Sequence, residues 1–199
     1  ALMWRTSWMS REVIILPAFI ALVGGWALLA TVSVVGAQQQ RWLSLLAIAG
    51  ALALWYCTAM IYACIRFIQE WAHPLTIINY ITIGMASGLV TSGALAVLAG
   101  ERQFAATIGV WALAGLAVAW ITRSLALIRN ARLKPKSTTQ SATGINSARV
   151  VQKSMGLMGG SFNTREFFHG ASLQAFRKAK VGFQVLAFGI PLLLVAWAV

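Results

Sequence analysis

Five long apolar segments most constrain what this chain can fold into. Each is long enough to cross a bilayer, which takes about 20 mostly apolar residues in a helix. The segments run approximately over residues 13–36, 42–65, 75–99, 104–128 and 181–199. Because the hydrocarbon core offers the backbone no hydrogen-bonding partner, each segment must be helical. The sequence therefore predicts an all-α integral membrane protein, a helical bundle with five transmembrane helices.

Composition agrees with a membrane protein. The 199 residues are 59% hydrophobic and only 10% charged, whereas soluble domains carry about 25% charged residues. Sixteen Lys and Arg against four acidic residues give a net charge of +12. In a membrane protein such an excess sets topology and contacts anionic lipids of the bilayer, so we expect no nucleic-acid partner. The chain starts at Ala1 without a methionine, and we expect its true N-terminus to lie upstream.

The basic residues are unevenly divided between the two sides of the membrane. With five spans, residues 1–12, 66–74 and 129–180 lie on one side, and fourteen of the sixteen Lys and Arg lie there, counting Arg123 at the end of the fourth span. Only Arg41 and Arg102 lie on the other side. Because Lys and Arg concentrate in cytoplasmic loops, the first side is predicted to face the cytoplasm.

Three regions follow from this layout. Residues 1–128 form a four-helix portion of the transmembrane bundle, residues 129–180 a basic cytoplasmic loop, and residues 181–199 the final transmembrane helix. The loop starts with KPKSTTQSATGIN, which has few apolar residues and is typical of a mobile linker. From Asn163 on, with Glu166 at the capping-box position, phenylalanines alternate with basic residues. This pattern predicts an amphipathic helix in the membrane interface.

Polar residues gather in three clusters: SWMSREV (7–13), RFIQEWAHP (66–74) and SFNTREFFHG (161–170). All three fall on the predicted cytoplasmic side, and together they hold three of the four acids and both histidines. No glutamate, lysine or histidine lies at the middle of a span, which counts against a transporter and against a haem held between helices. A cysteine set for an iron–sulfur cluster is also missing, so we expect no metal in this chain.

A membrane-surface site with carboxylates, arginines and indoles suits a quinone. The head group needs hydrogen-bond donors and groups that exchange protons, and the tail needs an apolar cleft. Glu12, at the start of the first span beside Arg11 and near Trp8, is the preferred proton-exchanging residue. The second candidates are Arg66, Glu70 and His73. The simpler interpretation is that such residues at span ends only snorkel or cap helices.

Small residues recur at every fourth position of the third span. They are Gly84, Gly88, Ser92, Ala96 and Gly100. Because small side chains let two helices approach closely, this stripe predicts packing within the bundle, with a dimer interface as the alternative.

Together the three clusters resemble the DmsC family of membrane anchors, which serves molybdenum oxidoreductases. The resemblance covers essentially the whole chain and rests on RFIQEWAHPLTIINY and GGSFNTREFFHG, since a bare SRE is weak. It implies a three-subunit enzyme of the bacterial inner membrane, whose anchor has further helices before the SRE segment. The orientation predicted from the basic residues places the C-terminus of the anchor in the periplasm. A molybdopterin catalytic subunit and a ferredoxin-like iron–sulfur subunit would hold those cofactors, and the anchor would bind ubiquinone or menaquinone and lack haem.

The resemblance also assigns residues. The family's SRE glutamate, which is associated with quinone binding, corresponds to Glu12, and a further family histidine lies upstream of this sequence. We expect docking of the iron–sulfur subunit at the third cluster, through Phe162, Arg165, Glu166 and His169.

Two substrates occur within the family that the chain resembles. Its dimethyl sulfoxide reductases face the periplasm and consume quinol, whereas a sulfite-oxidising relative faces the cytoplasm and reduces quinone. The predicted cytoplasmic orientation and the RFIQEWAHPLT segment favour a sulfite:quinone oxidoreductase. The alternatives are a quinol-oxidising anchor of a dimethyl sulfoxide reductase and, from another class, a small-molecule transporter or a purely structural tether.

Overall fold

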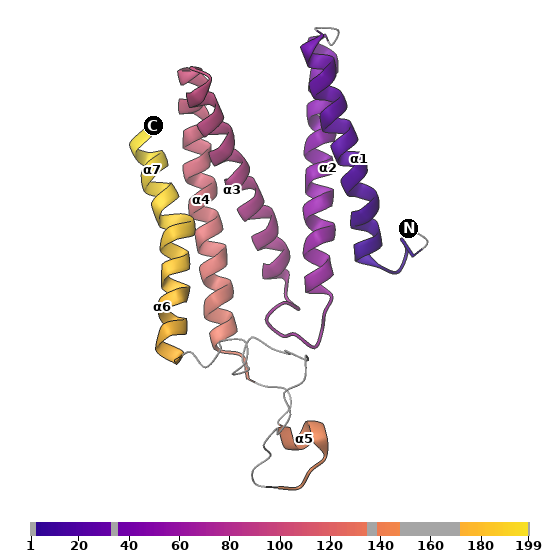
Figure 1. The fold of residues 1–199 in the computed structure, drawn as a ribbon, viewed down its shortest axis with the longest axis vertical. Coiled ribbons are helices and arrows are strands. Elements are labelled where there is room, and N and C mark those ends of the chain that lie inside the picture. Colours follow the sequence, from indigo (N-terminus) through magenta and orange to yellow (C-terminus); the bar gives the residue numbers. More distant parts are fainter. Residues whose placement is uncertain (1–2, 33–35, 135–138, 148–171, 199) are drawn as a thin grey trace.

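The computed structural model describes residues 3–32, 36–134, 139–147 and 172–198. In this part of the chain, five helices are long and apolar enough to cross a membrane, which confirms the predicted fold class (Figure 1). The first four are α1 (Trp8–Thr31), α2 (Ala37–Ala63), α3 (Pro74–Leu98) and α4 (Arg102–Ala131). The fifth is continuous and consists of α6 (Leu173–Gln184), η1 (Val185–Gly189) and α7 (Ile190–Ala198).

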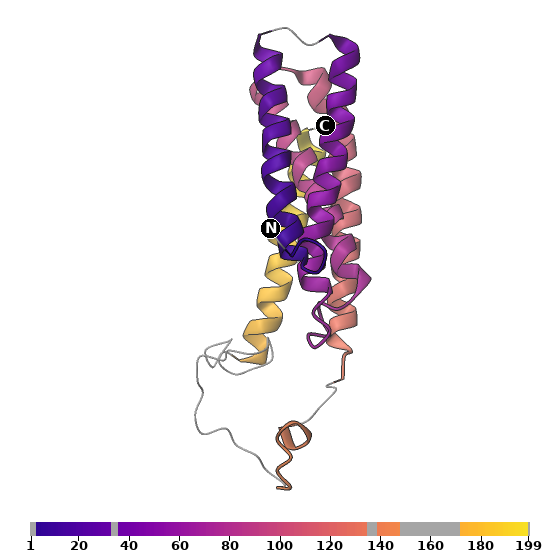
Figure 2. The same cartoon turned by 90° about the vertical axis from the view of Figure 1, so that its right-hand side faces the viewer.

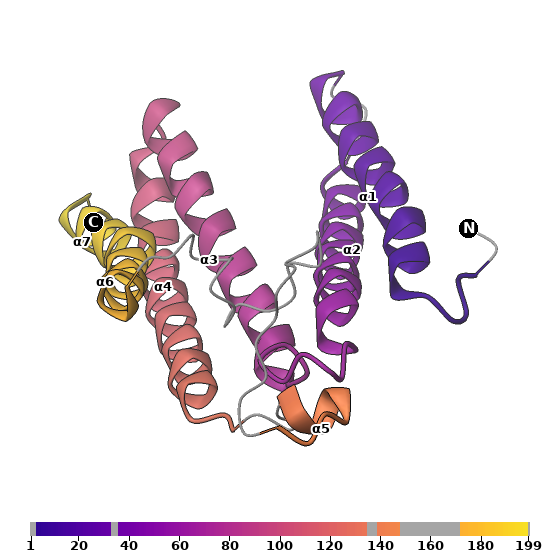
Figure 3. The same ribbon diagram turned by 60° about the horizontal axis from the view of Figure 1, so that its bottom comes forward.

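The long helices form two groups. Helix α1 pairs with α2, whereas α3 packs along α4 and the fifth helix lies on α4 (Figure 1). Helix α3 is oblique: its start lies beside the end of α2, and its end lies beside the start of α4 (Figure 3). The starts of α1, α3 and α6 and the ends of α2 and α4 all share one end of the bundle (Figure 1). We call this the basic end, because most of the Lys and Arg residues flank it.

Small side chains bring α3 and α4 together. Ala86 of α3 is buried with Leu116 and Ala119 of α4 and with Phe188 of the fifth helix. A Cβ added at Gly115 of α4 would lie 3.5 Å from the Cα of Ala86, so the two backbones approach closely there. Helices in lipid gain their contacts through such close packing. The core of the described chain therefore lies between α3, α4 and the fifth helix.

Helix α1 begins earlier than hydropathy predicts, at Trp8 rather than near residue 13. The Ser7 side chain caps it by accepting a hydrogen bond from the Ser10 N–H at 3.4 Å. Because a capped first turn satisfies its own backbone donors, the polar residues of this turn can be helical before the apolar stretch starts. Glu12 consequently lies in the second turn of α1, inside the helix.

The final span also differs from the prediction. Ser172 caps α6 by accepting a hydrogen bond from the Ala175 N–H at 3.2 Å, and α6 then continues without a break into η1 and α7 (Figure 1). In Figure 2 the start of α6 lies at the lower end of the bundle. The described part of the amphipathic segment is therefore the start of the fifth long helix rather than a separate interfacial helix. The predicted cap at Asn163 and Glu166 lies outside the described residues.

A short helix, α5 (Thr139–Thr143), occupies part of the segment that was predicted to be a linker. It ends at Gly144, whose φ of +69° is the left-handed conformation that glycine adopts at helix ends.

The η1 segment is a π-helical turn, in which the Ile190 N–H donates to the carbonyl of Val185 five residues earlier. Pro191 follows directly and has no N–H to donate to Ala187, its partner in a regular α-helix. A wider turn before a proline relieves the clash of the ring with the preceding turn.

Candidate functional site

A large cavity near the basic end gathers polar side chains from several helices. It has a volume of about 1040 Å³ and is lined by α1, α2, the α2–α3 connection, α3, α4 and α6. Cavities that bind small organic molecules measure about 300–1,000 Å³. This cavity is therefore large enough for an aromatic head group together with the start of an apolar tail.

The cavity has two walls whose charged residues are of opposite sign. The acidic wall comes from α1 and α2 and consists of Glu12, Leu16, Leu54, Trp55, Thr58 and Tyr62. The basic wall comes from α4 and α6 and includes Arg123, Ala126, Leu127, Arg129, Asn130, Phe176, Ala179, Lys180 and Phe183. Helix α3 lies between the two walls, because it contacts both α2 and α4.

Glu12 is the charged residue of the acidic wall. The Thr58 hydroxyl donates a 2.7 Å hydrogen bond to Oε1 of Glu12 and also lies 3.0 Å from the Leu54 carbonyl of its own helix. Within the described ranges no cation pairs with this carboxylate. A carboxylate can accept about four hydrogen bonds, so Glu12 keeps acceptor capacity for a ligand in the cavity.

Three aromatic side chains join α2 to α3 at the cavity. The Tyr62 ring lies 5.3 Å from Trp71 in an edge-on arrangement and 5.8 Å from Tyr80 in a stacked one, measured between ring centroids. All three line the cavity. Aromatic rings offer flat apolar faces on which another ring can stack.

His73 lines the cavity at the start of α3. Its Nδ1 accepts a 3.1 Å hydrogen bond from the Leu75 N–H, which caps the helix. Because Nδ1 accepts, the neutral ring carries its proton on Nε2. Burial, and to a lesser degree the Arg129 cation, lowers the pKa of His73 below its ordinary value of 6.5. His73 is therefore a neutral hydrogen-bond donor near pH 7.

Arg129 ties the basic wall to the α2–α3 connection. Both of its terminal nitrogens donate 3.2 Å hydrogen bonds to the Gln69 carbonyl, and Nη1 also donates to Oδ1 of Asn130 at 3.0 Å. Gln69 in turn donates to the Lys134 carbonyl at 3.2 Å. These bonds hold the connection that carries Glu70 and His73 against the end of α4.

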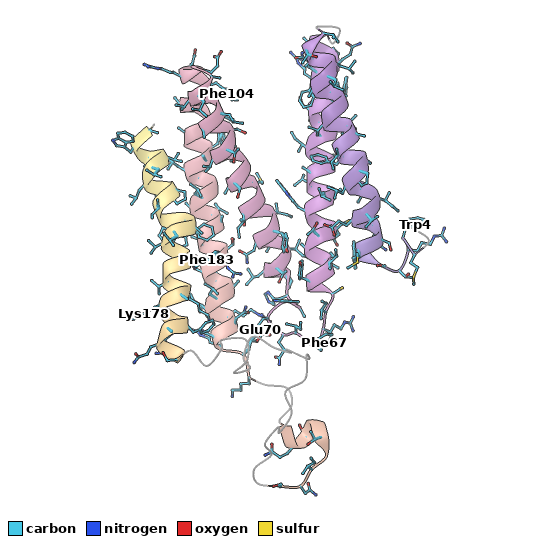
Figure 4. The ribbon with its side chains drawn as sticks, in the orientation of Figure 1. Trp4, Phe67, Glu70, Phe104, Lys178 and Phe183 are labelled. Atoms are coloured by element: carbon cyan, nitrogen blue, oxygen red, sulfur yellow. The ribbon has the colours of Figure 1, made fainter. Side chains whose placement is uncertain are left out.

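The other two cations of the basic wall lie over aromatic rings. The Arg123 guanidinium is 5.9 Å from the Phe183 ring, and the Lys180 ammonium is 4.0 Å from the Phe176 ring. Figure 4 shows Phe183 on α6 beside α4. Such contacts stabilise a cation without neutralising it. Since α4 extends to Ala131, Arg123 lies about two turns inside the helix rather than at its end.

Asn79 of α3 is a polar residue that the sequence interpretation missed. Its side chain is only 6% exposed, it lines the cavity, and its Oδ1 has no hydrogen-bond partner. Thr58 and Arg123 were missed as site residues in the same way. The available signal was a single polar residue inside an apolar span, which is costly in a membrane and therefore marks function.

Of the predicted quinone-site residues, the structure brings three into this cavity: Glu12, Glu70 and His73. Glu70 is half-buried and lies in the connection below α3 (Figure 4). They come from two of the three polar clusters, so the fold joins segments that are far apart in the sequence.

Three other predicted residues do not line the cavity. Arg11 lies 4.0 Å over the Trp8 ring and donates to the backbone carbonyl of Trp4 at 2.8 Å. The Trp8 ring packs edge-on against Tyr56 at 5.5 Å. Arg66 is exposed in the α2–α3 connection. Arg11 and Trp8 therefore hold the start of α1 in place, next to the cavity rather than in it.

The predicted docking residues Phe162, Arg165, Glu166 and His169 lie outside the described residues. Among His, Cys, Asp and Glu in the described ranges, no three are grouped so that they could hold a metal ion.

Of the predicted packing stripe, Gly84 contacts another helix of the bundle. A Cβ added there would lie 2.7 Å from the Trp55 ring of α2, whereas one added at Gly88 would meet nothing within 4 Å. Ser92 is exposed. Gly84 and Trp55 both line the cavity, so Gly84 permits the contact between α2 and α3 at the cavity itself, and packing at Gly88 and Ser92 stays a prediction.

Comparisons with known proteins agree with the resemblance noted in the sequence. A sequence model of the family described as DMSO reductase anchor subunit (DmsC) matches residues 3–180. A sulfite dehydrogenase subunit of Allochromatium vinosum is 45% identical over 205 aligned positions, which cover 98% of this chain and 63% of that relative. The chain thus spans somewhat less than two thirds of the length of this relative. No solved structure matches.

Proposed function

Since this chain belongs to the DMSO reductase anchor subunit (DmsC) family, we propose that it anchors a molybdenum and iron–sulfur oxidoreductase in the membrane and exchanges electrons with quinone. The electrons pass between quinone and an iron–sulfur partner subunit, which is connected to a molybdopterin catalytic subunit. Both partners dock at the basic end, on the cytoplasmic side of a bacterial inner membrane. Phe162, Arg165, Glu166 and His169 contribute to this docking.

The observation that carries the proposal is the cavity near the basic end. It combines a carboxylate at Glu12, aromatic faces at Tyr62 and Tyr80, and a neutral donor at His73 within apolar surroundings. A quinone ring needs these features: a flat surface to stack on, donors for its carbonyls and a group that exchanges protons.

Proton exchange is assigned to Glu12. Reduction of a quinone consumes two electrons and two protons and converts its two carbonyls to hydroxyls. The iron–sulfur subunit supplies the electrons. Glu12 passes one proton to a ring oxygen and recovers it from the nearby membrane surface, which also supplies the proton for the second ring oxygen. Thr58 holds the carboxylate in place through its 2.7 Å hydrogen bond. His73 and Glu70 are placed to bind the ring or to take part in this proton exchange.

Sulfite is the favoured substrate of the catalytic subunit, with quinone as the electron acceptor. The relative of 45% identity belongs to a sulfite dehydrogenase. The family description names DMSO reductase, so a quinol-oxidising anchor for dimethyl sulfoxide reduction is the second candidate. The assembled complex should oxidise sulfite with a soluble quinone and should not reduce dimethyl sulfoxide with a quinol.

Glu12→Gln in the assembled complex tests the proposal. Because positioned acid–base groups contribute about 10²–10⁴-fold, quinone turnover should fall at least about 100-fold. Sulfite oxidation with a soluble dye, which takes its electrons before the anchor, should be unchanged. Glu101→Gln is the control, since Glu101 lies at the opposite end as the N-cap of α4 and should leave quinone turnover unchanged. Normal quinone turnover in a normally assembled Glu12→Gln complex would contradict the role of Glu12.

A further inference from the structure

Asn79 is a buried amide in the cavity that no part of the proposed proton exchange uses. It is 6% exposed, and its Oδ1 has no hydrogen-bond partner. Buried polar atoms in folded proteins are nearly always hydrogen-bonded, so an unpaired one needs an explanation. Since the residue lines the cavity, the missing partner is most simply a molecule in that cavity.

A second buried amide shows why the cavity matters. Gln184 also has a buried Oε1 without a partner, but its Nε2 donates to Ser124 Oγ at 3.2 Å, and Gln184 does not line the cavity. The amide nitrogen of Gln184 thus has a hydrogen-bond partner within the protein. In the described part of the chain, the Asn79 side chain has no hydrogen bond at all, and it alone of the two lines the ligand space.

Asn79 also lies at the depth of the carboxylate. Glu12 is four residues into α1, Thr58 is five residues before the end of α2, and Asn79 is five residues into α3. At about 1.5 Å per residue, each is about 6–8 Å along its helix from the basic end. A planar head group at this depth would meet the carboxylate from α1 and the amide from α3.

From these positions we propose that Asn79 is the ligand of a ring oxygen of the quinone head group in both oxidation states. This inference rests on the proposed quinone function. An amide has two N–H donors and one carbonyl acceptor. It donates to a carbonyl oxygen of the oxidised ring, and after a half-turn of the side-chain amide it accepts from the hydroxyl of the reduced ring. Neither a lysine nor an ionised carboxylate can do both.

The apolar variant Asn79→Leu tests the inference in the assembled complex. The KM for a short-chain soluble quinone should rise about tenfold or more, because the ring loses a buried hydrogen bond. Sulfite oxidation with a soluble dye should be unchanged. The thermal stability of the complex without added quinone should not fall, since the variant replaces an unpaired amide by an apolar group of similar size.

Infrared difference spectra supply a readout that a purely structural role would not change. With a quinone labelled at its carbonyl carbons, the hydrogen-bonded carbonyl of the wild-type complex should absorb at a lower frequency than in Asn79→Leu. Gln184→Leu is the matched control and should change neither the KM nor the carbonyl band. If Asn79→Leu prevents assembly, Asn79→Ala removes the amide without added bulk and has the same expected outcome.

The possible failures are distinguishable. A wild-type complex that exchanges no electrons with quinone contradicts the proposed function and this inference with it. Active wild-type complex, together with an Asn79→Leu or Asn79→Ala variant of unchanged KM and unshifted carbonyl band, contradicts the inference alone. Equal effects of Asn79→Leu and Gln184→Leu would also overturn it, because the effect would then follow from losing any buried amide.

Discussion

The acidic and basic walls of the cavity carry opposite charges. In each wall the charged side chains contact nearby uncharged groups: a hydroxyl, a backbone carbonyl, an amide or an aromatic ring. Glu12 accepts a hydrogen bond from Thr58. On the other wall, Arg129 donates to the Gln69 carbonyl and to Asn130. The remaining two cations lie over phenylalanine rings.

Across the cavity, the described residues form no ion pair between these walls. An ion pair there would pull the helices together and would use up the groups that a ligand needs. Charges in a membrane are costly, so residues that keep their charge without neutralising one another mark a site for something else. The charged groups thus leave the space between the walls available, while aromatic packing around Tyr62 and the hydrogen bonds of Arg129 to the Gln69 carbonyl join the helices around it.

The largest effect should come from the contact that sets the distance between α2 and α3. In Gly84→Ala the new Cβ would lie 2.7 Å from the Trp55 ring, so the ring or the helix must move. Overpacking of this kind costs about 1–3 kcal/mol. We expect a lower thermal midpoint of the solubilised protein, measured by the loss of its helical circular-dichroism signal on heating.

Gly88→Ala is the matched control, because a Cβ there meets nothing within 4 Å. Replacing a helical glycine by alanine usually gains about 0.5–1 kcal/mol, so this variant should be neutral or slightly more stable. Equal destabilisation by both substitutions would show that Gly88 packs against a helix outside the described residues, as the stripe of small residues predicted.

A smaller effect should come from the hydrogen bond that positions Glu12. Thr58→Val keeps the shape of the side chain and removes the hydroxyl that donates to Oε1 of Glu12. The loss of one such bond is worth about 1 kcal/mol, so quinone turnover should fall about fivefold, and Thr58→Ser should restore it. Thr107→Val is the control, since the Thr107 hydroxyl donates to the Gln103 carbonyl of its own helix, and Thr107 does not line the cavity. Unchanged turnover in Thr58→Val would mean that Glu12 acts without this support.

The smallest effect concerns the pH dependence that His73 contributes. Its pKa in the folded protein is lowered by burial and by Arg129, so folding favours the neutral ring. Its contribution to stability is therefore fully present above the ordinary value of about 6.5 and is lost as the pH falls through the lower folded-state pKa. We expect the half-life of the solubilised complex at elevated temperature to be constant from about pH 7 to 8 and to shorten below about pH 6.5.

His73→Asn is the comparison, because asparagine also caps a helix but does not titrate. The variant should lose the part of the acid sensitivity that arises from His73. The same pH profile in both proteins would show that other groups of the complex determine the acid sensitivity.

The fold was largely predictable, because the bilayer limits a chain of this composition to helices of a known length. The helix ends were less predictable. Hydropathy locates the apolar stretch, whereas capping by Ser7 and Ser172 determines where α1 and α6 begin. As a result, Glu12 lies farther inside α1 than the apolar segment alone indicated. Arg123 also lies farther inside its helix, because α4 continues to Ala131.

The site was predictable only in part. The polar clusters led to Glu12, Glu70 and His73, because charged residues beside spans are visible in the sequence. They also led to Arg11 and Arg66, whose side chains point elsewhere, since proximity in sequence does not determine which face of a helix a residue occupies. Asn79 and Thr58 could be assigned only from the structure. It shows that Thr58 donates to Glu12 and that the buried Oδ1 of Asn79 has no partner, and neither fact is visible in a single polar letter within an apolar span.

The π-helical turn η1 separates two parts of the last span, one that lines the cavity and one that packs in the core. Phe176, Lys180 and Phe183 follow one another at regular helical spacing and line the cavity. Ala187 follows at the same spacing, and the next residue, Phe188, starts a second stripe that continues through Leu192 and Val195 in the core with α3 and α4. The π-helical turn of η1 contains one residue more than an α-helical turn, so the residues after it are shifted by one position around the helix axis. One continuous helix can therefore keep both its cavity-facing stripe and its packing stripe on the side of α4. Deleting a single residue from Val185–Gly189 would rotate one stripe relative to the other by about 100°.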